Sequence, residues 1–234
     1  MRIVILALGS FFLTVCAVSQ ATAQVSLQCV VPAIVPGPST PPFPGSAEEI
    51  ARLRQAPRGA KRVGKRQLVV NWTAGKRTFK NDPHTEELGD VWWAYCGFSS
   101  ELSLHLIWHA TSNQIFTGVM LDEKTGSLLP AGEAVLFSPD HRFYLAYEQP
   151  DGQDGETLKL YKRSGEMIWK GFDFIATADN KSVIVPAENM RNMRWDSRNR
   201  PEATLHLDGG RTMTVTLMRD EHGKLEWLPR VPAH

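Results

Sequence analysis

The stretch AVLFSPDHRFYLAYEQPDGQDGETLKLYKRSGEMIWK, which runs from Ala134 to Lys170, decides the fold class. Its apolar residues alternate with a period near two, as in Phe143, Leu145 and Tyr147. This period is typical of strands, because successive side chains of a strand point to opposite faces. The segment Ser138–His141 supplies a turn between two strands, since proline presets φ and aspartate bonds its own backbone two residues on. The stretch therefore predicts antiparallel hairpins.

The same pattern continues over most of the chain. Clusters of turn residues separate short apolar runs at intervals of about 8 to 12 residues, as in β-sandwiches and β-barrels. We predict an all-β domain over residues 66–234, an antiparallel meander of short strands packed as a sandwich or as a partial propeller-like structure. The predicted strands are 67–72, 91–98, 102–109, 114–121, 134–137, 142–147, 157–162, 166–170, 172–176, 181–185, 203–207, 211–218 and 224–227.

The amino terminus has the features of a bacterial-type signal peptide. Arg2 precedes an apolar run from Ile3 to Val18, and Ala21-Thr22-Ala23 matches a cleavage site of small residues. The apolar run is shorter than the roughly 20 residues of a membrane span. We therefore expect cleavage after Ala23, a periplasmic or secreted protein, and no stable membrane span afterwards.

Removal of residues 1–23 leaves 25 basic and 25 acidic residues, so the mature chain has no net charge. Such a balance does not favour nucleic acid as a partner. Cys29 and Cys96 are the two cysteines that remain, and in an oxidising compartment they are expected to form a disulfide. Closing this loop would stabilise the fold by on the order of 4 kcal/mol. In the alternative interpretation, Cys96 is a nucleophile with His84 or His105 as its base.

Residues 24–45 form a proline-rich segment, which we interpret as an extended linker. Residues 46–65 follow as a short helix and a basic connector. Ser46 and Glu49 have the spacing of a capping box, and Pro57 limits the helix to about 47–55.

The basic connector carries seven cations between Arg52 and Arg66 and no acid. It could contact a phosphate-bearing surface, which outside the cytosol means lipid head groups or a polyanionic glycan. In the other interpretation it is a solvated connector whose charges keep it extended, and we favour this one.

Hairpin motifs recur in the predicted domain. Ser138–Ala146 aligns with Thr177–Val185 at an offset of 39 residues, and Gly165–Trp169 aligns with Gly223–Trp227 at an offset of 58. The two offsets differ, which indicates recurring hairpins rather than one duplication.

The run Phe137-Ser138-Pro139-Asp140-His141-Arg142 resembles the Phe-Ser-Pro-Asp-Gly-Lys hairpin of WD-repeat-like β-propellers. The resemblance implies a binding scaffold without catalytic residues, and some exported propellers of this kind serve in envelope complexes. This sequence has His141 where the family has glycine, and it lacks the Trp-Asp ending of a blade. Its strands suffice for two or three blades, fewer than the four of a small propeller.

The segment Met190–Arg200 combines methionine, arginine and tryptophan, a composition typical of interface cores. We predict that Arg191, Arg194, Trp195 and Arg198 bind a partner. The alternative is an ordinary surface loop.

We predict no metal or cofactor. His105 and His109 are four residues apart in a predicted strand, where about 13 Å separates them. The loop Asp151–Glu156 lacks the ligand spacing of a calcium-binding EF-hand loop. Hydrolase, nucleotide-binding and zinc-protease motifs are absent from the sequence.

These observations favour an exported, non-catalytic, β-rich binding protein of the cell envelope, whose partner is a protein or an envelope component. Two alternatives stay open. One is an extracellular hydrolase that acts on cell-wall or other glycans through scattered carboxylates and tryptophans. The other is a secreted inhibitor or immunity protein.

Overall fold

The structure is a computed structural model that describes residues 24–29, 43–85, 89–112, 115–150, 157–171, 174–176, 182–184 and 190–230. The predicted signal peptide, most of the proline-rich linker and the loop 151–156 lie outside the described residues. The described part is built from antiparallel sheets and one short helix, which confirms the predicted all-β class. It contains no helix with the length and apolar composition of a membrane span.

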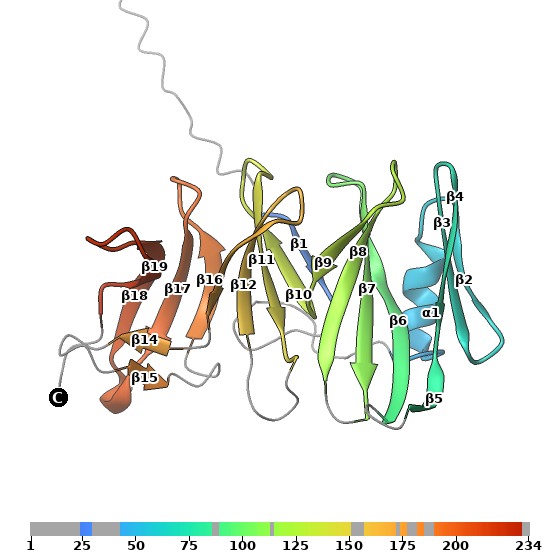
Figure 1. Cartoon of the computed structure of the whole chain (residues 1–234), viewed down its shortest axis with the longest axis horizontal. Helices are drawn as coiled ribbons and strands as arrows, with labels where there is room; N and C mark the ends of the chain where they lie inside the picture. Colours follow the sequence, from blue (N-terminus) through green and yellow to red (C-terminus); the bar gives the residue numbers. More distant parts are fainter. Residues whose placement is uncertain are drawn as a thin grey trace, which may run out of the picture.

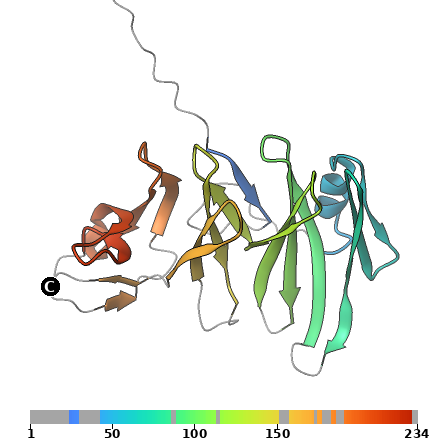
Figure 2. The same cartoon turned by 45° about the horizontal axis from the view of Figure 1, so that its top comes forward.

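Four larger sheets stand side by side in a row (Figure 1), and the tilted view in Figure 2 shows the same order. The basic sheet at one end has the strand order β2-β3-β4, and the second sheet has the order β5-β6-β7-β8-β9. Their strands are β2 (Ala60–Val63), β3 (Gln67–Trp72), β4 (Gly75–Lys80), β5 (Asp82–Thr85), β6 (Gly89–Ser99), β7 (Leu104–Thr111), β8 (Phe116–Asp122) and β9 (Leu128–Ala131).

The third sheet has the order β1-β10-β11-β12-β13, and the fourth sheet, at the far end of the row, has the order β16-β17-β18-β19. A two-stranded ribbon, β14 with β15, lies beside the fourth sheet. The strands are β1 (Ser26–Gln28), β10 (Ala134–Phe137), β11 (Phe143–Glu148), β12 (Thr157–Lys162), β13 (Met167–Gly171), β14 (Phe174–Ala176), β15 (Ser182–Ile184), β16 (Met190–Trp195), β17 (Pro201–His206), β18 (Thr212–Arg219) and β19 (Leu225–Leu228). A short 3₁₀ turn, Asp208–Gly210, joins β17 to β18.

Each of the last three sheets contains four consecutive strands in meander order, as predicted: β6 to β9, β10 to β13 and β16 to β19.

The turn of the propeller-like motif is closed by hydrogen bonds from its own side chains. Asp140 Oδ1 accepts hydrogen bonds from the Ser138 hydroxyl and the Arg142 amide, and His141 has a φ of 56° where the family has glycine. A relation to WD-repeat-like propellers stays a hypothesis.

Three apolar cores fill the spaces between the four sheets. One joins the helix and the basic sheet to the second sheet, one joins the second sheet to the third, and one joins the third to the fourth. The second and third sheets are therefore covered on both faces. This explains why β7 is buried along almost its whole length, with Leu106 facing one core and Ile107 the other. The two end sheets each keep one face toward solvent.

The two aligned Gly-to-Trp segments occupy equivalent places in the row. β13 is the last strand of the third sheet and β19 is the last strand of the fourth. Trp169 and Trp227 meet edge to face with ring centroids 6.3 Å apart, and Trp169 Nε1 donates to the Leu225 carbonyl. The recurrence seen in the sequence thus corresponds to one contact between neighbouring sheets.

The helix and the disulfide form as predicted. Helix α1 spans Ala47–Arg54, and the Ser46 hydroxyl accepts a hydrogen bond from the Glu49 amide. Cys29 and Cys96 are joined. Because β1 belongs to the third sheet and β6 to the second, this bond connects two sheets. Cys96 is consequently no free thiol, and its interpretation as a nucleophile is wrong.

Candidate functional site: a basic groove beside the N-terminal helix

The segment predicted to bind a partner is strand β16 and the turn after it, rather than a surface loop. Met193 and Trp195 point into the core between the third and fourth sheets, and Trp195 is 7% exposed. Its indole Nε1 donates to the Leu136 carbonyl. Arg194 pairs with Glu202 on the neighbouring strand. Trp195 therefore stabilises the fold, which the sequence-based interpretation did not foresee.

A bulge explains why the sequence pattern of β16 was misread. The register with β17 shifts between Arg191 and Arg194, and Asn192 takes a positive φ of 54°. The extra residue breaks the alternation of Met190, Met193 and Trp195, although all three are buried.

The predicted residues are not brought together at one open site. Arg191 and Arg194 lie on β16, and Arg198 is exposed in the turn to β17. Trp195 lines a groove of about 510 Å³ between the third and fourth sheets, together with Phe143, Ile168 and Leu217. Partner binding at these residues stays a prediction.

The opposite end of the row carries a stronger charge asymmetry. Ten lysines and arginines lie between Ile50 and Asn81, and no Asp or Glu lies among them. This run covers most of α1 and the whole basic sheet. The sequence-based interpretation of residues 46–65 as helix and connector missed β2, whose four residues pair with β3.

The register of the basic sheet separates its cations into two groups. One row across β2, β3 and β4 contains Lys61, Val69 and Thr78. The next row on the same face contains Val63, Gln67 and Lys80. Residues opposite each other share a face, and alternate residues of a strand share it too. Lys61, Lys76 and Lys80 are therefore on the outer face, and all three are exposed.

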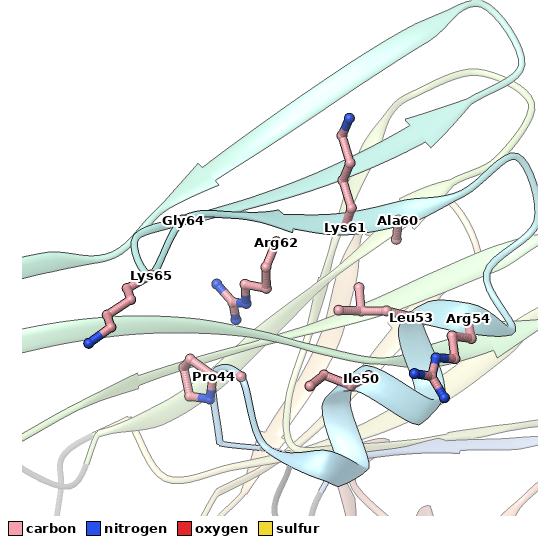
Figure 3. Close-up of a pocket in the computed structure, with 10 residues that line it drawn as sticks. Pro44, Ile50, Leu53, Arg54, Ala60, Lys61, Arg62, Gly64 and Lys65 are labelled. Carbon is pink, nitrogen blue, oxygen red and sulfur yellow. The ribbon is translucent and has the colours of Figure 1, made fainter.

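Arg62 lies on the other face of β2, toward the helix. Figure 3 shows its guanidinium directed into the space between β2 and α1, where Ile50 and Leu53 approach from the helix. A groove of about 580 Å³ opens here. The described residues that line it are Pro44, Gly45, Ile50, Leu53, Arg54, Ala60, Lys61, Arg62, Gly64 and Lys65, and none of these is acidic.

A buried ion pair holds the back of the groove in place. Arg62 Nε donates to Glu49 Oε2 at 2.9 Å, and Arg62 Nη2 donates to Glu49 Oε1 at 2.6 Å. Glu49 is fully buried and also accepts from the amides of Gly45 and Tyr95. Arg62 Nη2 donates in addition to the Trp93 carbonyl. These bonds fix α1, β2 and β6 relative to one another.

The remaining donors of the groove are not satisfied by the described protein. Arg62 Nη1 has no acceptor in the described part of the chain. In Figure 3, Lys65 and Arg54 lie toward opposite ends of the groove. Neither has an acidic partner among the described residues, whereas Arg58 nearby pairs with Glu123 at 2.7 Å. The groove thus combines apolar walls with cationic ends.

A buried polar chain lies behind the basic sheet. The Tyr95 hydroxyl is 2.9 Å from His105 Nδ1, and His105 Nε2 is 2.7 Å from Glu123 Oε2. Burial raises the pKa of Tyr95, and the negative charge of Glu123 adds to this. Burial lowers the pKa of His105, against the opposing effect of Glu123. Tyr95 therefore donates to a neutral imidazole, which donates to the carboxylate.

This chain has the residue types of a catalytic relay but lies inside a core. His105 is 0% exposed and is not among the described residues that line the two grooves. Its ring packs against Phe98 at 4.8 Å between centroids. Arg58, which follows α1, pairs with Glu123, so this series of hydrogen bonds connects the segment after the helix to the interior of the second sheet. We assign these buried polar residues a structural role.

Comparison with known proteins gives no family to this chain. No family model, no curated protein and no solved structure matches it.

Proposed function

We propose that this is an exported, non-catalytic binding protein that attaches to an anionic surface of the cell envelope through its basic end. The observation that carries this proposal is the run from Ile50 to Asn81, with ten cations and no acid, folded into one end of the row of sheets. The disulfide between Cys29 and Cys96 is compatible with export, because such bonds persist in oxidising compartments.

The outer face of the basic sheet supplies the contact surface. Lys61, Lys76 and Lys80 project from it, and they have no acidic partner in the described part of the chain. Each cation near an anionic leaflet contributes about 1 kcal/mol. The mature chain as a whole is neutral, so the attraction is confined to this end and orients the molecule.

The test is co-sedimentation of the mature protein with vesicles of phosphatidylcholine, with and without phosphatidylglycerol. We expect binding only when phosphatidylglycerol is present. The triple variant Lys61→Gln, Lys76→Gln, Lys80→Gln should bind about a hundredfold more weakly, which corresponds to about 3 kcal/mol. Raising the ionic strength from about 0.1 M to about 1 M should release the protein, because the Debye length falls from about 10 Å to about 3 Å.

A control variant with the same charge loss lies at the other end of the row. Arg198, Arg211 and Lys224 are exposed in the fourth sheet and its turns, and their replacement by glutamine should leave binding unchanged. Equal losses for the two triple variants would show that net charge, rather than the basic end, governs attachment. Equal sedimentation with neutral and anionic vesicles would overturn the proposal.

A further inference from the structure

We propose that the groove between α1 and β2 binds one anionic phospholipid molecule, with an acyl chain along its apolar wall and the phosphate at its cationic end. This inference rests on the proposed function and deepens it. The outer face would attract a charged surface, and the groove would take a single lipid from it.

The size and composition of the groove suit such an occupant. Its volume of about 580 Å³ lies within the range of about 300 to 1,000 Å³ that small-molecule sites occupy. Pro44, Ile50, Leu53 and Ala60 provide apolar contact surface. Lys65 and Arg54 provide positive charge without a described acidic partner, as set out above.

Exposed apolar residues gather around the same groove. Two of the five large apolar side chains that are exposed in the described part line a groove at this end: Ile50, which is 41% exposed, and Phe43, which is 58% exposed. A second groove of about 340 Å³ adjoins the first through Pro44 and Lys65, and Phe43 lines it. Apolar side chains exposed in one place indicate an interaction site. Their combination with unpaired cations favours an amphiphile over a purely polar polyanion.

Lys65 is the residue placed to hold the phosphate. It is common to the linings of both grooves, and Arg66 follows it in the second one. The apolar wall of the first groove begins beside it at Pro44, as Figure 3 shows, and continues to Ile50 and Leu53 on the helix. A phosphate at Lys65 therefore leaves the wall formed by Ile50 and Leu53 for one acyl chain.

The test uses lipids that remain monomeric, so that no surface is present. Calorimetry of the mature protein should show saturable binding of dihexanoylphosphatidylglycerol at one site. Dihexanoylphosphatidylcholine, which keeps the chains and has no net charge, should bind at least about tenfold more weakly. Glycerophosphoglycerol, which keeps the charged phosphodiester and has no chains, should also bind at least about tenfold more weakly. Each tenfold loss corresponds to 1.4 kcal/mol.

Two variants address the groove itself. Ile50→Gln removes apolar wall and Lys65→Gln removes the phosphate partner; each should weaken binding of the short-chain phosphatidylglycerol at least about tenfold. Both residues lie at the surface, and near-ultraviolet circular dichroism would verify that the variants fold. Met167→Gln is the matched apolar control, because Met167 is 51% exposed on β13, away from the groove.

The double variant Lys76→Gln, Lys80→Gln separates this inference from the proposed function, because both residues lie on the outer face and neither lines the groove. It should weaken vesicle binding and keep the affinity for the monomeric lipid. Vesicle binding without saturable binding of the monomer would overturn the groove inference and leave the proposed function intact. Failure of both would overturn both. Binding of a polyglutamate peptide that is lost in Ile50→Gln, with no binding of the lipid, would assign the groove to an acidic protein partner instead.

Discussion

The two ends of the row differ in how their charges are arranged. Between Ile50 and Asn81 there are ten basic residues and no acid, whereas between Met190 and Arg230 there are eight basic and six acidic residues. In the fourth sheet three arginines meet a local acid: Arg194 meets Glu202, Arg200 meets Asp196 and Arg230 meets Glu226. At the basic end, Arg62 and Arg58 meet Glu49 and Glu123, which lie outside this run. Arg52 and Arg77 donate to backbone carbonyls, and Lys61, Lys76 and Lys80 are exposed.

This difference teaches which basic residues are available to a partner. An exposed pair such as Arg194 with Glu202 neutralises itself and leaves little field for an external ligand. Unpaired cations on one face keep their field and attract anions. Local acid content, more than the number of arginines, distinguishes the candidate surface at the basic end from the one predicted at Met190–Arg200.

The largest expected effect compares the ion pairs of the two ends. Glu49→Ala should destabilise the protein by about 3 to 5 kcal/mol, because it leaves the charge of Arg62 buried without its partner. Glu202→Ala in the fourth sheet should cost at most about 1 kcal/mol, because Arg194 is largely exposed. Urea unfolding of both variants measures the two values. Equal losses of unfolding free energy in the two variants would show that the ion pair between Glu49 and Arg62 does not stabilise the groove more than a surface pair does.

The second prediction concerns the bond between the second and third sheets. Cys29→Ser with Cys96→Ser should destabilise the protein by about 2 to 4 kcal/mol, since 67 residues separate the joined cysteines. The effect should be largest where β1 and β6 meet and smallest in the fourth sheet, which the bond does not reach. Amide hydrogen exchange would resolve this gradient along the row. Uniform loss of protection would mean that the sheets unfold as one unit.

The third prediction is a pH dependence that originates behind the basic sheet. The folded pKa of His105 lies below its ordinary value of 6.5 because of burial. The unfolded chain therefore takes up a proton near pH 6.5 that the folded protein does not bind. Stability from this group is fully present above pH 6.5 and is lost as the pH falls toward the folded pKa, with a slope of at most about 1.4 kcal/mol per pH unit.

Unfolding in urea between pH 7 and pH 5 measures this slope. His105→Gln lowers the stability at pH 7, because it breaks the contacts with Tyr95 and Glu123, and it should also remove the His105 contribution to the slope. His206→Gln is the control from the fourth sheet, since His206 is exposed on β17. An unchanged slope in His105→Gln would contradict the assignment.

Much of the fold could be predicted from the sequence where a strand has an apolar face. Strands β3, β10 and β12 have the predicted bounds. In β10 and β12 alternate residues face the two cores on either side of the third sheet, and in β3 Leu68 and Val70 face one core. The capping box at Ser46 is a local signal, and it predicted α1 to within one residue. The disulfide was predicted from the two cysteines that remain after the expected signal peptide.

The strands that were missed lack such a face. In β2 the residue directed toward the helix is Arg62, whose partner Glu49 lies on α1, so no apolar alternation marks the strand. In β4 the buried apolar residue is Phe79. In β9 Pro130 was interpreted as a strand break, although proline is tolerated in a strand at a sheet edge.

The groove was also missed, because its geometry depends on the ion pair between Glu49 of α1 and Arg62 of β2, and no pattern within one element reveals such a pair. The absence of acids from Ile50 to Asn81 was the signal that could have indicated it.

The smallest effects on stability and on vesicle binding are expected for the segment Met190–Arg200, which the sequence analysis predicted to bind a partner. Replacing Arg191, Arg194 and Arg198 together by glutamine should change stability by less than about 1 kcal/mol, because these side chains are exposed or paired at the surface. Trp195 is left intact, since its removal from the core would unfold the sheet contact rather than test a surface. Affinity for anionic vesicles should stay within about twofold, because the unpaired cations at the opposite end are untouched. If this variant instead loses vesicle binding while the outer-face variant of the basic sheet keeps it, the fourth sheet is the binding end. Charge pairing would then be the wrong criterion for choosing between the two surfaces.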